Sequence, residues 1–414
     1  MIYKQKKNCR CCFSNNLYTY IDLSNQPLAN DYHKNKKLKK IPLKVAVCTN
    51  CFHSQLTVVV QPASMFKNYL YVSGTTKTFQ NHTKNLALDV VKRFKNKNKL
   101  KVLDVACNDG TQLEHFKNLK CNVYGVDPAE NLRKITKSKK IPVEVAYWNK
   151  KTADKYNFKF NIITATNVFA HVDDIYDFLS TSAYALSDDG LIIIEFPYGV
   201  NMISNNEFDT IYHEHLSYFL VSSFKTLVKK SKLKIVDLKR TQIHGGSIRF
   251  YLSKTGKTTQ KVYQLVNREK EKGLYSINTY NKFNKNVNYN KVKMNALVEN
   301  LKLKNKKVIG YGASAKGNTM LNYFKLNLEY IVDDNELKWG YKTPGRNIKI
   351  KSPEVLRKEK EELYIVILSW NFYNEISKNI SLLRGNKYND KAIVYIPKVK
   401  MRNIKLRAKY NYSA

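Results

Sequence analysis

The sequence predicts an α/β protein in which two nucleotide-binding-type units follow a cysteine-bearing segment. Four cysteines near the start of the chain form two C-x-x-C pairs, a spacing typical of a zinc site. A buried strand, a glycine-bearing turn and a helix then occur twice, in KLKVLDVACNDGTQLEHF from Lys99 and in KKVIGYGASAKGNTMLNYF from Lys306. This order of elements opens many nucleotide-binding α/β units.

The composition indicates a folded chain without a membrane span. The chain has 414 residues, of which 43% are hydrophobic, enough for two or three domains with their own cores. It contains no run of about 18 apolar residues, the length that crosses a bilayer. The opening MIYKQKKNCRCC has no apolar core and so does not resemble a secretory signal. Because an odd number of cysteines, seven, suits metal binding in a reducing compartment, we expect a cytoplasmic protein.

The chain is strongly basic, with 72 Lys+Arg against 33 Asp+Glu and a net charge of +39. Clustered cations would indicate a nucleic-acid binder, because they gain affinity by releasing counterions. Here the lysines are spread along the whole length and no strand-mounted aromatic motif accompanies them. This distribution favours compositional bias together with attraction to an anionic substrate. We therefore expect no nucleic-acid partner.

The two C-x-x-C pairs predict a structural zinc site with the ligands Cys9, Cys12, Cys48 and Cys51. Four thiolates fill the tetrahedral coordination sphere of Zn²⁺, so the site is closed and not catalytic. Cys11 lies inside the first pair and competes as a ligand, although the spacing favours Cys9. A nucleic-acid-binding zinc ribbon is the alternative. The residues between the pairs, DLSNQPLANDYHKN, are predicted to form a polar loop.

The first α/β unit predicts a cofactor site in the turn after its first strand. The strand is predicted at Val102–Val105, the turn at Asn108–Gly110 and the helix at Gln112–Leu119. Asp127 ends the next strand, 23 residues after Asp104 (127 − 104), where an acid can bind ribose hydroxyls. The fingerprint G-x-G-x-x-G is missing. The turn therefore makes no special provision for a pyrophosphate, which favours S-adenosylmethionine over NAD.

Two further strands are predicted at Asn161–Val172 and Leu191–Tyr198. Parallel strands present their carboxyl ends at one edge of the sheet, where ligands bind. Asn167 and His171 fall at this edge. The alternative for His171 is a helix-capping or core histidine.

The block Tyr212-His213-Glu214-His215 is the strongest candidate for proton transfer, because imidazole, carboxylate and phenol together cover the useful pKa range. In an extended segment, alternate side chains share a face, which pairs Tyr212 with Glu214 and His213 with His215. A metal-ligand pair or a hydrogen-bonded core turn is the alternative.

The rest of the chain supplies further candidates. HGGSIR, from His244 to Arg249, allows close backbone approach at its glycines, although Arg249 has the alternative of pairing with a surface carboxylate. Residues 254–299 are predicted to form a connecting helix. The second α/β unit offers a phosphate-binding helix N-terminus with Lys316. The basic tail after it shows no predicted structure.

The whole pattern resembles the nucleotide-sugar C-methyltransferases, which use S-adenosylmethionine to methylate C3 of a nucleotide-linked 4-keto-deoxysugar. The resemblance runs nearly end to end and rests on PLKVAVCTNCFHSQL, YVSGTT, DVACNDGT, IYHEHLSYF, HGGSIRFY, YGASAKGNTMLNYF and SWNFYNEI. Asp104 and Cys107 stand where Glu and Ser are expected. The resemblance implies a class I methyltransferase domain at 73–298, a zinc-binding domain at 1–72, a Rossmann-like domain at 299–400 and a basic tail at 401–414.

The resemblance also implies the roles of single residues. His215 would be the base that removes the C3 proton, Tyr212 and Glu214 would be its partners, and His171 and Tyr71 would lie near the sugar. Expected contacts to S-adenosylmethionine come from Asp104, Ala106, Asn108, Asp109, Gly110, Asp127 and Asn167. Expected contacts to the substrate come from His213, His244, Gly245, Gly246, Arg249, Lys316 and Asn318.

The implied substrate is a nucleotide-sugar, dTDP-linked or carrying another base, and we expect a monomer. Two alternatives stay open. One is an O- or N-methyltransferase on a similar activated sugar, and the other is a zinc-ribbon RNA-binding methyltransferase or adaptor.

Overall fold

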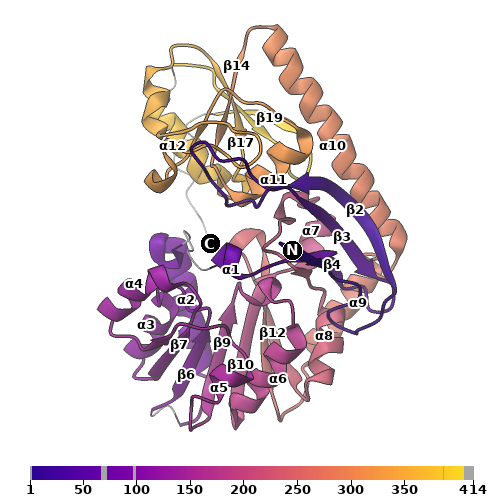
Figure 1. Ribbon diagram of the computed structural model, residues 1–414, viewed down its shortest axis with the longest axis vertical. Coiled ribbons are helices and arrows are strands. Elements are labelled where there is room, and N and C mark those ends of the chain that lie inside the picture. The colour runs from indigo at the N-terminus through magenta and orange to yellow at the C-terminus, as the bar shows by residue number, and fades with distance from the viewer. Residues whose placement is uncertain (1, 67–71, 97–98, 386, 405–414) are drawn as a thin grey trace, which may run out of the picture. The chain divides into compact units, whose positions relative to one another are not determined.

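The computed structural model describes residues 2–66, 72–96, 99–385 and 387–404, and the chain divides into two compact units (Figure 1). The first unit comprises Met1–Tyr18, Ala46–Val200 and Glu214–Ser276. The second unit comprises Thr19–Val45, Asn201–His213 and Ile277–Ala414. Each unit is therefore assembled from separate stretches of sequence.

The first unit contains a sheet that has, within the described residues, seven strands in the order β12-β13-β10-β9-β6-β7-β8. Strands β6 to β10 run parallel, and β13 is antiparallel to both of its neighbours. The chain moves outward from β6 through β7 to β8 and then returns to β9, on the other side of β6. The order reverses between β6 and β9, and ligands bind at such a switch point, at the carboxyl edge. The strands are β6 (Lys101–Val105), β7 (Asn122–Val126), β8 (Val143–Glu144), β9 (Phe160–Thr166), β10 (Leu186–Pro197), β12 (Lys234–Thr241) and β13 (Ser247–Ser253).

Helices cover this sheet and bury their apolar stripes on it. Helix α2 (Lys77–Val91) buries Leu86 and Val90 in one core with Val102 and Ile193 of the strands. The other helices of the first unit are α1 (Ala63–Phe66), which buries none of its residues, α3 (Thr111–Asn118), α4 (Arg133–Ser138), α5 (Lys150–Ala153), α6 (Ile175–Ala185), α8 (Val221–Lys230) and α9 (Gln260–Glu271).

The cysteine-bearing segment adds short strands to the first unit. Strand β1 (Tyr3–Gln5) pairs antiparallel with β5 (Val58–Val60). Strand β4 (Ser54–Leu56) pairs antiparallel with β11 (Ser217–Tyr218), so residues just after the second C-x-x-C pair lie against residues just after the Tyr212–His215 block.

The second unit contains a sheet in the order β16-β15-β14-β17-β18-β19, parallel except for β19. Its core includes Ile309, Val332, Ile365 and Ile380. The strands are β14 (Lys307–Tyr311), β15 (Ile331–Val332), β16 (Ile350–Lys351), β17 (Leu363–Ile367), β18 (Lys391–Val394) and β19 (Lys400–Asn403). The helices are α7 (Gly199–Ser204, which begins in the first unit), α10 (Ile277–Leu303), α11 (Ala315–Phe324) and α12 (Tyr373–Arg384).

Two predictions of irregular structure are wrong in part. The predicted polar loop begins inside β2 (Leu17–Gln26), which lies beside β3 (Ile41–Cys48). The predicted unstructured tail begins with β19, because Lys400–Asn403 pairs with β18 and satisfies its backbone groups there. In the part of the chain that is described, no helix has both the length and the hydropathy to span a membrane.

Candidate active site

The turn after β6 is built from residues in the left-handed region. Ala106, Asn108 and Gly110 have φ of 58°, 52° and 75°. A Cβ on Gly110 would lie 2.9 Å from Cδ1 of Ile141, so glycine is required there for space as well as for conformation. This turn brings the chain directly from the carboxyl end of β6 into the N-terminus of α3.

Asp127, at the end of β7, holds this turn. Its Oδ2 accepts a hydrogen bond of 2.8 Å from the backbone N–H of Asn108, and its Oδ1 accepts one of 2.8 Å from Ala129. Burial raises the pKa of this carboxyl. Asp127 therefore lies at the predicted edge, beside the predicted cofactor turn.

Asp104 lies beneath the turn, inside the sheet. Its carboxylate is buried and accepts hydrogen bonds from Thr164 Oγ1 at 2.6 Å and Gln112 Nε2 at 2.8 Å. Burial raises its pKa to about 7. These contacts join β6, β9 and α3, so in the described structure Asp104 supports the turn from below, and its contact with a cofactor stays a prediction.

The segment YVSGTT is tied to the turn by two backbone donors. Ser73 N donates to Asn108 Oδ1 at 2.9 Å, and Gly74 N donates to Asp109 Oδ2 at 3.1 Å. A Cβ on Gly74 would lie 2.5 Å from the same Asp109 oxygen, so a larger residue would force the two segments apart. Tyr71, predicted to lie near the substrate, falls outside the described residues.

Asn167 provides the observation that best fits a bound cofactor. It has a φ of 58° just past β9, and its N–H donates to Glu195 O at 2.8 Å. Its side-chain Oδ1 is inaccessible to solvent and has no hydrogen-bond partner among the described residues. Buried acceptors are normally satisfied. A donor on a cofactor, such as the amino group of S-adenosylmethionine, would satisfy this one.

His171 and His215 meet edge to face, with ring centroids 4.9 Å apart and an interplanar angle of 88°. Strand β9 ends at Thr166, earlier than predicted, and His171 lies in a short 3₁₀ turn, Phe169–His171. Desolvation lowers the pKa of His171 to about 4, so its ring is neutral at pH 7. The backbone holds the pair together, since Leu216 N donates to Ala170 O at 2.8 Å. The structure thus joins two histidines that lie 44 positions apart (215 − 171).

The Tyr212–His215 block lies in a turn and not in a strand, so the predicted pairing of alternate side chains on shared faces does not hold. The division between the compact units falls after His213. His213 is buried, with Nε2 at 3.3 Å from the carbonyl oxygens of both Ile41 and Pro42. Burial lowers its pKa to about 4. Contact of His213 with a substrate stays a prediction, as do the roles of Tyr212 and Glu214.

A buried charged group that the sequence reading missed lies between α2 and the strands. Glu195 is fully buried, and its two carboxylate oxygens contact His82 Nε2 at 2.6 Å and Arg249 Nε at 2.7 Å. Arg249 is itself buried and pairs with this interior carboxylate, and its Nη1 also lies 4.0 Å from Oδ2 of the partly exposed Asp89. The signal was a single charge inside each of two apolar runs, LIIIEFPY and SIRFYL. Gly245 and Gly246, with φ of 90° and 112°, precede β13, the strand that carries Arg249. His244 lies in the 3₁₀ turn Ile243–Gly245.

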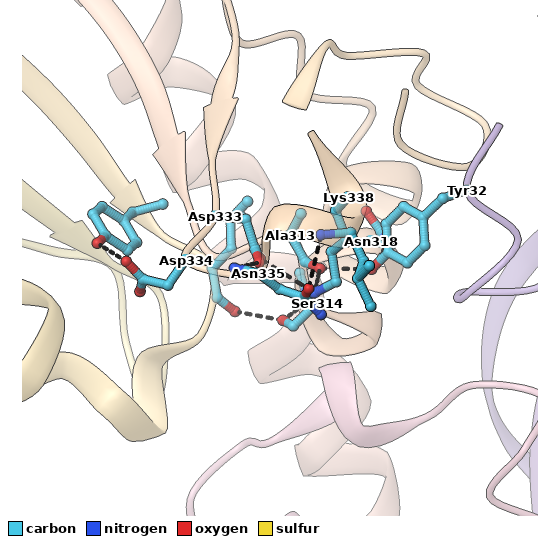
Figure 2. A network of polar contacts seen from close by, with 12 residues as sticks. Tyr32, Ala313, Ser314, Asn318, Asp333, Asp334, Asn335 and Lys338 are labelled. Carbon is cyan, nitrogen blue, oxygen red and sulfur yellow. Dashed lines mark hydrogen bonds and ion pairs between the residues drawn. The ribbon is translucent and has the colours of Figure 1, made fainter. Parts of the chain in front are cut away.

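In the second unit, side chains from other segments of the same unit contact the turn between β14 and α11 (Figure 2). Ala313 O accepts hydrogen bonds from Tyr32 OH at 2.6 Å and from Lys338 Nζ at 2.8 Å. Asn318, a predicted substrate contact, donates to Ala29 O at 2.8 Å and to Tyr32 OH at 3.2 Å. Both bonds lie within the protein, so its Nδ2 already has partners there.

Charge is also neutralised within this unit. Asp333, the acid after β15, pairs with Lys338 at 3.3 Å (Figure 2). Lys316 lies in the first turn of α11, with its Nζ 4.5 Å from the centroid of the Trp370 ring. Ser314 caps that helix by accepting from Gly317 N at 3.1 Å. An α11 N-terminus with a cation in its first turn is the arrangement predicted to bind phosphate.

The four predicted zinc ligands converge. The Sγ atoms of Cys9, Cys12, Cys48 and Cys51 all lie within 4.8 Å of one another, and two of the pairs, Cys9–Cys51 and Cys12–Cys48, are 3.5 Å apart. Zn–S bonds of about 2.3 Å in a tetrahedron require sulfurs about 3.8 Å apart, so this donor set fits zinc. Cys11 is buried outside the group.

Comparisons with known proteins agree with this arrangement. Three family models match: a zinc binding domain at residues 9–66, a methyltransferase domain at 79–238 and a C-methyltransferase C-terminal domain at 242–397. The chain is 29% identical over 384 residues to the C-methyltransferase NovU of Streptomyces niveus, covering 90% of this chain and 91% of that protein.

Solved structures resemble part of the chain. An S-adenosylmethionine-dependent methyltransferase from Clostridium acetobutylicum ATCC 824 is 15% identical, with a TM-score of 0.35, over 43% of this chain and 92% of that one. The magnesium protoporphyrin IX methyltransferase of Synechocystis PCC 6803 with bound S-adenosylmethionine is 13% identical, with a TM-score of 0.34, over 42% and 79%.

Proposed function

We propose that this chain, an S-adenosylmethionine-dependent methyltransferase of the class I fold with C-methyltransferase relatives, methylates C3 of a nucleotide-linked 4-keto-deoxysugar. The observation that carries the proposal is the contact between His171 and His215 in the unit that contains the cofactor turn. Methylation of carbon needs a base, because a C–H group does not present a lone pair as a hydroxyl or an amine does. A pair of imidazoles beside the carboxyl edge of β9 provides that base.

The residues at the sheet edge fit the cofactor. The backbone of the turn ending at Gly110, the carboxylate of Asp127 and the unsatisfied Oδ1 of Asn167 are the groups that would hold S-adenosylmethionine. When bound, the cofactor supplies an electrophilic methyl group on a positively charged sulfur. The protein must then provide a carbon nucleophile in line with it, and proximity of this kind is worth about 7–11 kcal/mol.

His215 takes the C3 proton in this proposal. The C4 ketone makes that proton acidic, and its removal places negative charge on O4. His171, neutral because its pKa is about 4, keeps an N–H that can donate to this oxygen. One such donor typically contributes about 3–4 kcal/mol. A neutral ring also avoids charge repulsion when His215 becomes protonated beside it.

The sugar nucleotide itself is supported by the sequence resemblance and by charge. A nucleoside diphosphate is anionic, and the chain has a net charge of +39. The α11 turn with Lys316 is our candidate for the diphosphate. The other predicted contacts to substrate, His244, Gly245, Gly246, Arg249 and Asn318, stay predictions, and for Arg249 the described partner is Glu195.

Exchange of the C3 hydrogen tests the proposal against an O- or N-methyltransferase. The enzyme is incubated in D₂O with a dTDP-4-keto-deoxysugar and S-adenosylhomocysteine, which binds without methylating, and C3 is followed by NMR. We expect deuterium at C3 with the wild type and none above background with His215→Ala. The 4-hydroxy form of the same sugar nucleotide is the matched control, because it has no ketone to acidify C3. Absence of C3 exchange, together with methylation of an oxygen or nitrogen when S-adenosylmethionine replaces S-adenosylhomocysteine, would overturn the proposal.

Titration with tRNA tests the zinc-ribbon alternative. Only the net charge supports that alternative. Binding by charge releases counterions from the phosphates, so we expect tRNA affinity to fall steeply between about 50 and 200 mM salt. Binding of the sugar nucleotide should persist over the same range. Salt-sensitive tRNA binding without sugar-nucleotide binding would favour the alternative.

A further inference from the structure

We infer that Arg10, inside the first C-x-x-C pair, is a positioning residue that fastens the His171–His215 pair to the zinc-binding segment through Asp173. This inference deepens the proposed function and rests on it. Arg10, which lies between Cys9 and Cys11, is 2% exposed. A buried guanidinium needs partners for its charge and its donors, and the identity of those partners shows what it does.

Arg10 contacts two other segments, β4 and the loop that carries Asp173. Its Nε and Nη2 both lie 3.3 Å from Asp173 Oδ1, and its Nη1 donates to Leu56 O at 3.1 Å. Its backbone N–H donates to Gln55 Oε1 at 2.8 Å. The knuckle is thereby fixed at once to β4 and to the loop that carries Asp173.

Asp173 also forms ion pairs with two lysines that precede the first C-x-x-C pair. Lys4 Nζ lies 3.0 Å from its Oδ2 and Lys6 Nζ lies 3.0 Å from its Oδ1. Three cations on one carboxylate exceed what neutralising a single surface acid requires. They make the position of this loop depend on the segment that holds the four cysteines.

The contacts form a closed ring that includes both histidines. Asp173 follows His171 by two residues, and Ala170 O accepts from Leu216 N at 2.8 Å. Leu216 follows His215, and its O accepts from Leu56 N at 3.0 Å. Leu56 O then accepts from Arg10, which closes the ring. Beside it, His53 Nε2 and Ser217 Oγ lie 3.3 Å apart, in line with the β4–β11 pairing.

This ring gives Arg10 a role in chemistry as well as in folding. The two imidazoles lie on different segments, and the backbone on both sides of their contact is fastened to the cysteine segment. Without Arg10–Asp173, the His171 turn keeps its own bond to Leu216 but loses its anchor. A misplacement of about 1 Å can cost about 100-fold in rate. The zinc site then fixes the geometry of proton transfer without touching a substrate.

Asp173→Asn tests the inference, because it keeps the shape of the side chain and removes its charge. We expect kcat and the rate of C3 deuterium exchange to fall together by about 10- to 100-fold. The affinity for S-adenosylhomocysteine should stay within about twofold, and the zinc content should stay near one ion per chain. In ¹³C-histidine NMR, the Cε1–H signals of His171 and His215, assigned with single variants, should shift.

The matched control is Asp237→Asn. Asp237 on β12 is likewise held by an arginine and a lysine, Arg93 at 2.9 Å and Lys261 at 3.0 Å. Asp237 takes no part in the ring. The Asp237→Asn protein should therefore show the same C3 exchange rate and the same histidine signals as the wild type. Arg10→Lys, which keeps the charge but loses the fork, should slow exchange by a smaller factor. This second variant decides the matter if Asp173→Asn does not fold.

The outcomes separate the inference from the proposed function. If His215→Ala abolishes exchange while Asp173→Asn and Arg10→Lys exchange within about twofold of the wild type, the positioning role is wrong and the base assignment stands. If His215→Ala exchanges normally, the proposed function fails and the inference fails with it. Loss of zinc or of cofactor binding in proportion to lost exchange would show that Arg10 is structural only.

Discussion

His171 and His215 reach their contact by different local devices. His171 is the last residue of a 3₁₀ turn after β9, whereas His215 follows a turn and lies just before β11. The hydrogen bond from Leu216 N to Ala170 O holds the two turns together. At the scale of residues, the sequence located both histidines as candidates. It could not show that they touch, because their contact depends on where two unrelated turns end.

Replacement of the base is the first prediction at this scale. We expect His215→Ala to lower kcat by about 10²–10⁴, the range typical of a lost general base. S-adenosylmethionine affinity should stay within about twofold, and the melting temperature should change little. Steady-state kinetics, calorimetric titration and thermal unfolding measure the three quantities. Turnover within about tenfold of the wild type would place the base elsewhere.

His213 gives a prediction about pH and stability. Its pKa is lowered to about 4 by burial, against about 6.5 in the unfolded chain. The unfolded state therefore binds more protons between these values. Neutral His213 stabilises the fold fully above pH 6.5, and this contribution is lost as the pH falls from 6.5 towards 4. The loss between pH 7 and pH 5 is about 2 kcal/mol.

His213→Gln removes the titrating group but keeps a donor for the carbonyl oxygens of Ile41 and Pro42. Its free energy of unfolding should therefore depend less steeply on pH than that of the wild type between pH 7 and pH 5. Urea unfolding at several pH values measures this difference. Equal pH dependence in the two proteins would contradict the buried, neutral state of His213.

At the scale of elements, the connection between the YVSGTT segment and the β6–α3 turn is the most constrained feature of the cofactor site. Ser73 and Gly74 donate to adjacent side chains of the turn, and Gln80 of α2 donates back to Gly74 O at 2.6 Å. The sequence predicts the turn from its glycine and contains the YVSGTT segment as a separate motif. It cannot predict that they are joined, because the joining bonds come from backbone N–H groups.

Gly74→Ala tests this connection. The new Cβ would lie 2.3 Å from Thr111 Oγ1 and 2.5 Å from Asp109 Oδ2, so the turn must shift. We expect the affinity for S-adenosylmethionine to fall about tenfold, equivalent to about 1.4 kcal/mol, in calorimetric titration. Gly340→Ala is the control, because a Cβ there meets nothing within 4 Å. Equal affinities in the two variants would show that Gly74 is not coupled to the cofactor turn.

At the scale of the whole molecule, the order of functional segments was predictable and their division into compact units was not. The spacing of the cysteines predicted the metal-ligand group, and the two runs of strand, turn and helix predicted the parallel strands that open the two sheets. The three consecutive domains expected from the sequence stay a prediction, while the compact units exchange segments within β2 and β3. The second half of β2 was predicted as polar loop because half of the residues of this strand are exposed, whereas β3 has no exposed residue.

Removal of the metal is the prediction at this scale. We expect about one zinc per chain in the wild type. In Cys48→Ser both zinc and thermal stability should be lost, because the energy of metal binding contributes directly to folding. Cys121→Ser should keep its zinc, since this thiol lies outside the group of four. Elemental analysis and thermal unfolding of both variants measure the effect. A full complement of zinc in Cys48→Ser would refute the assignment of ligands.

The buried ion pair between Glu195 and Arg249 has a consequence for engineering this protein. These residues stand opposite each other in the antiparallel pairing of β10 and β13, and His82 of α2 completes the cluster. A slip of one residue would turn the arginine to the other face of the sheet and leave the buried carboxylate without its cation, with only the imidazole of His82 as a partner. A chimera in which either strand comes from another methyltransferase must therefore keep Glu195, Arg249 and His82 together.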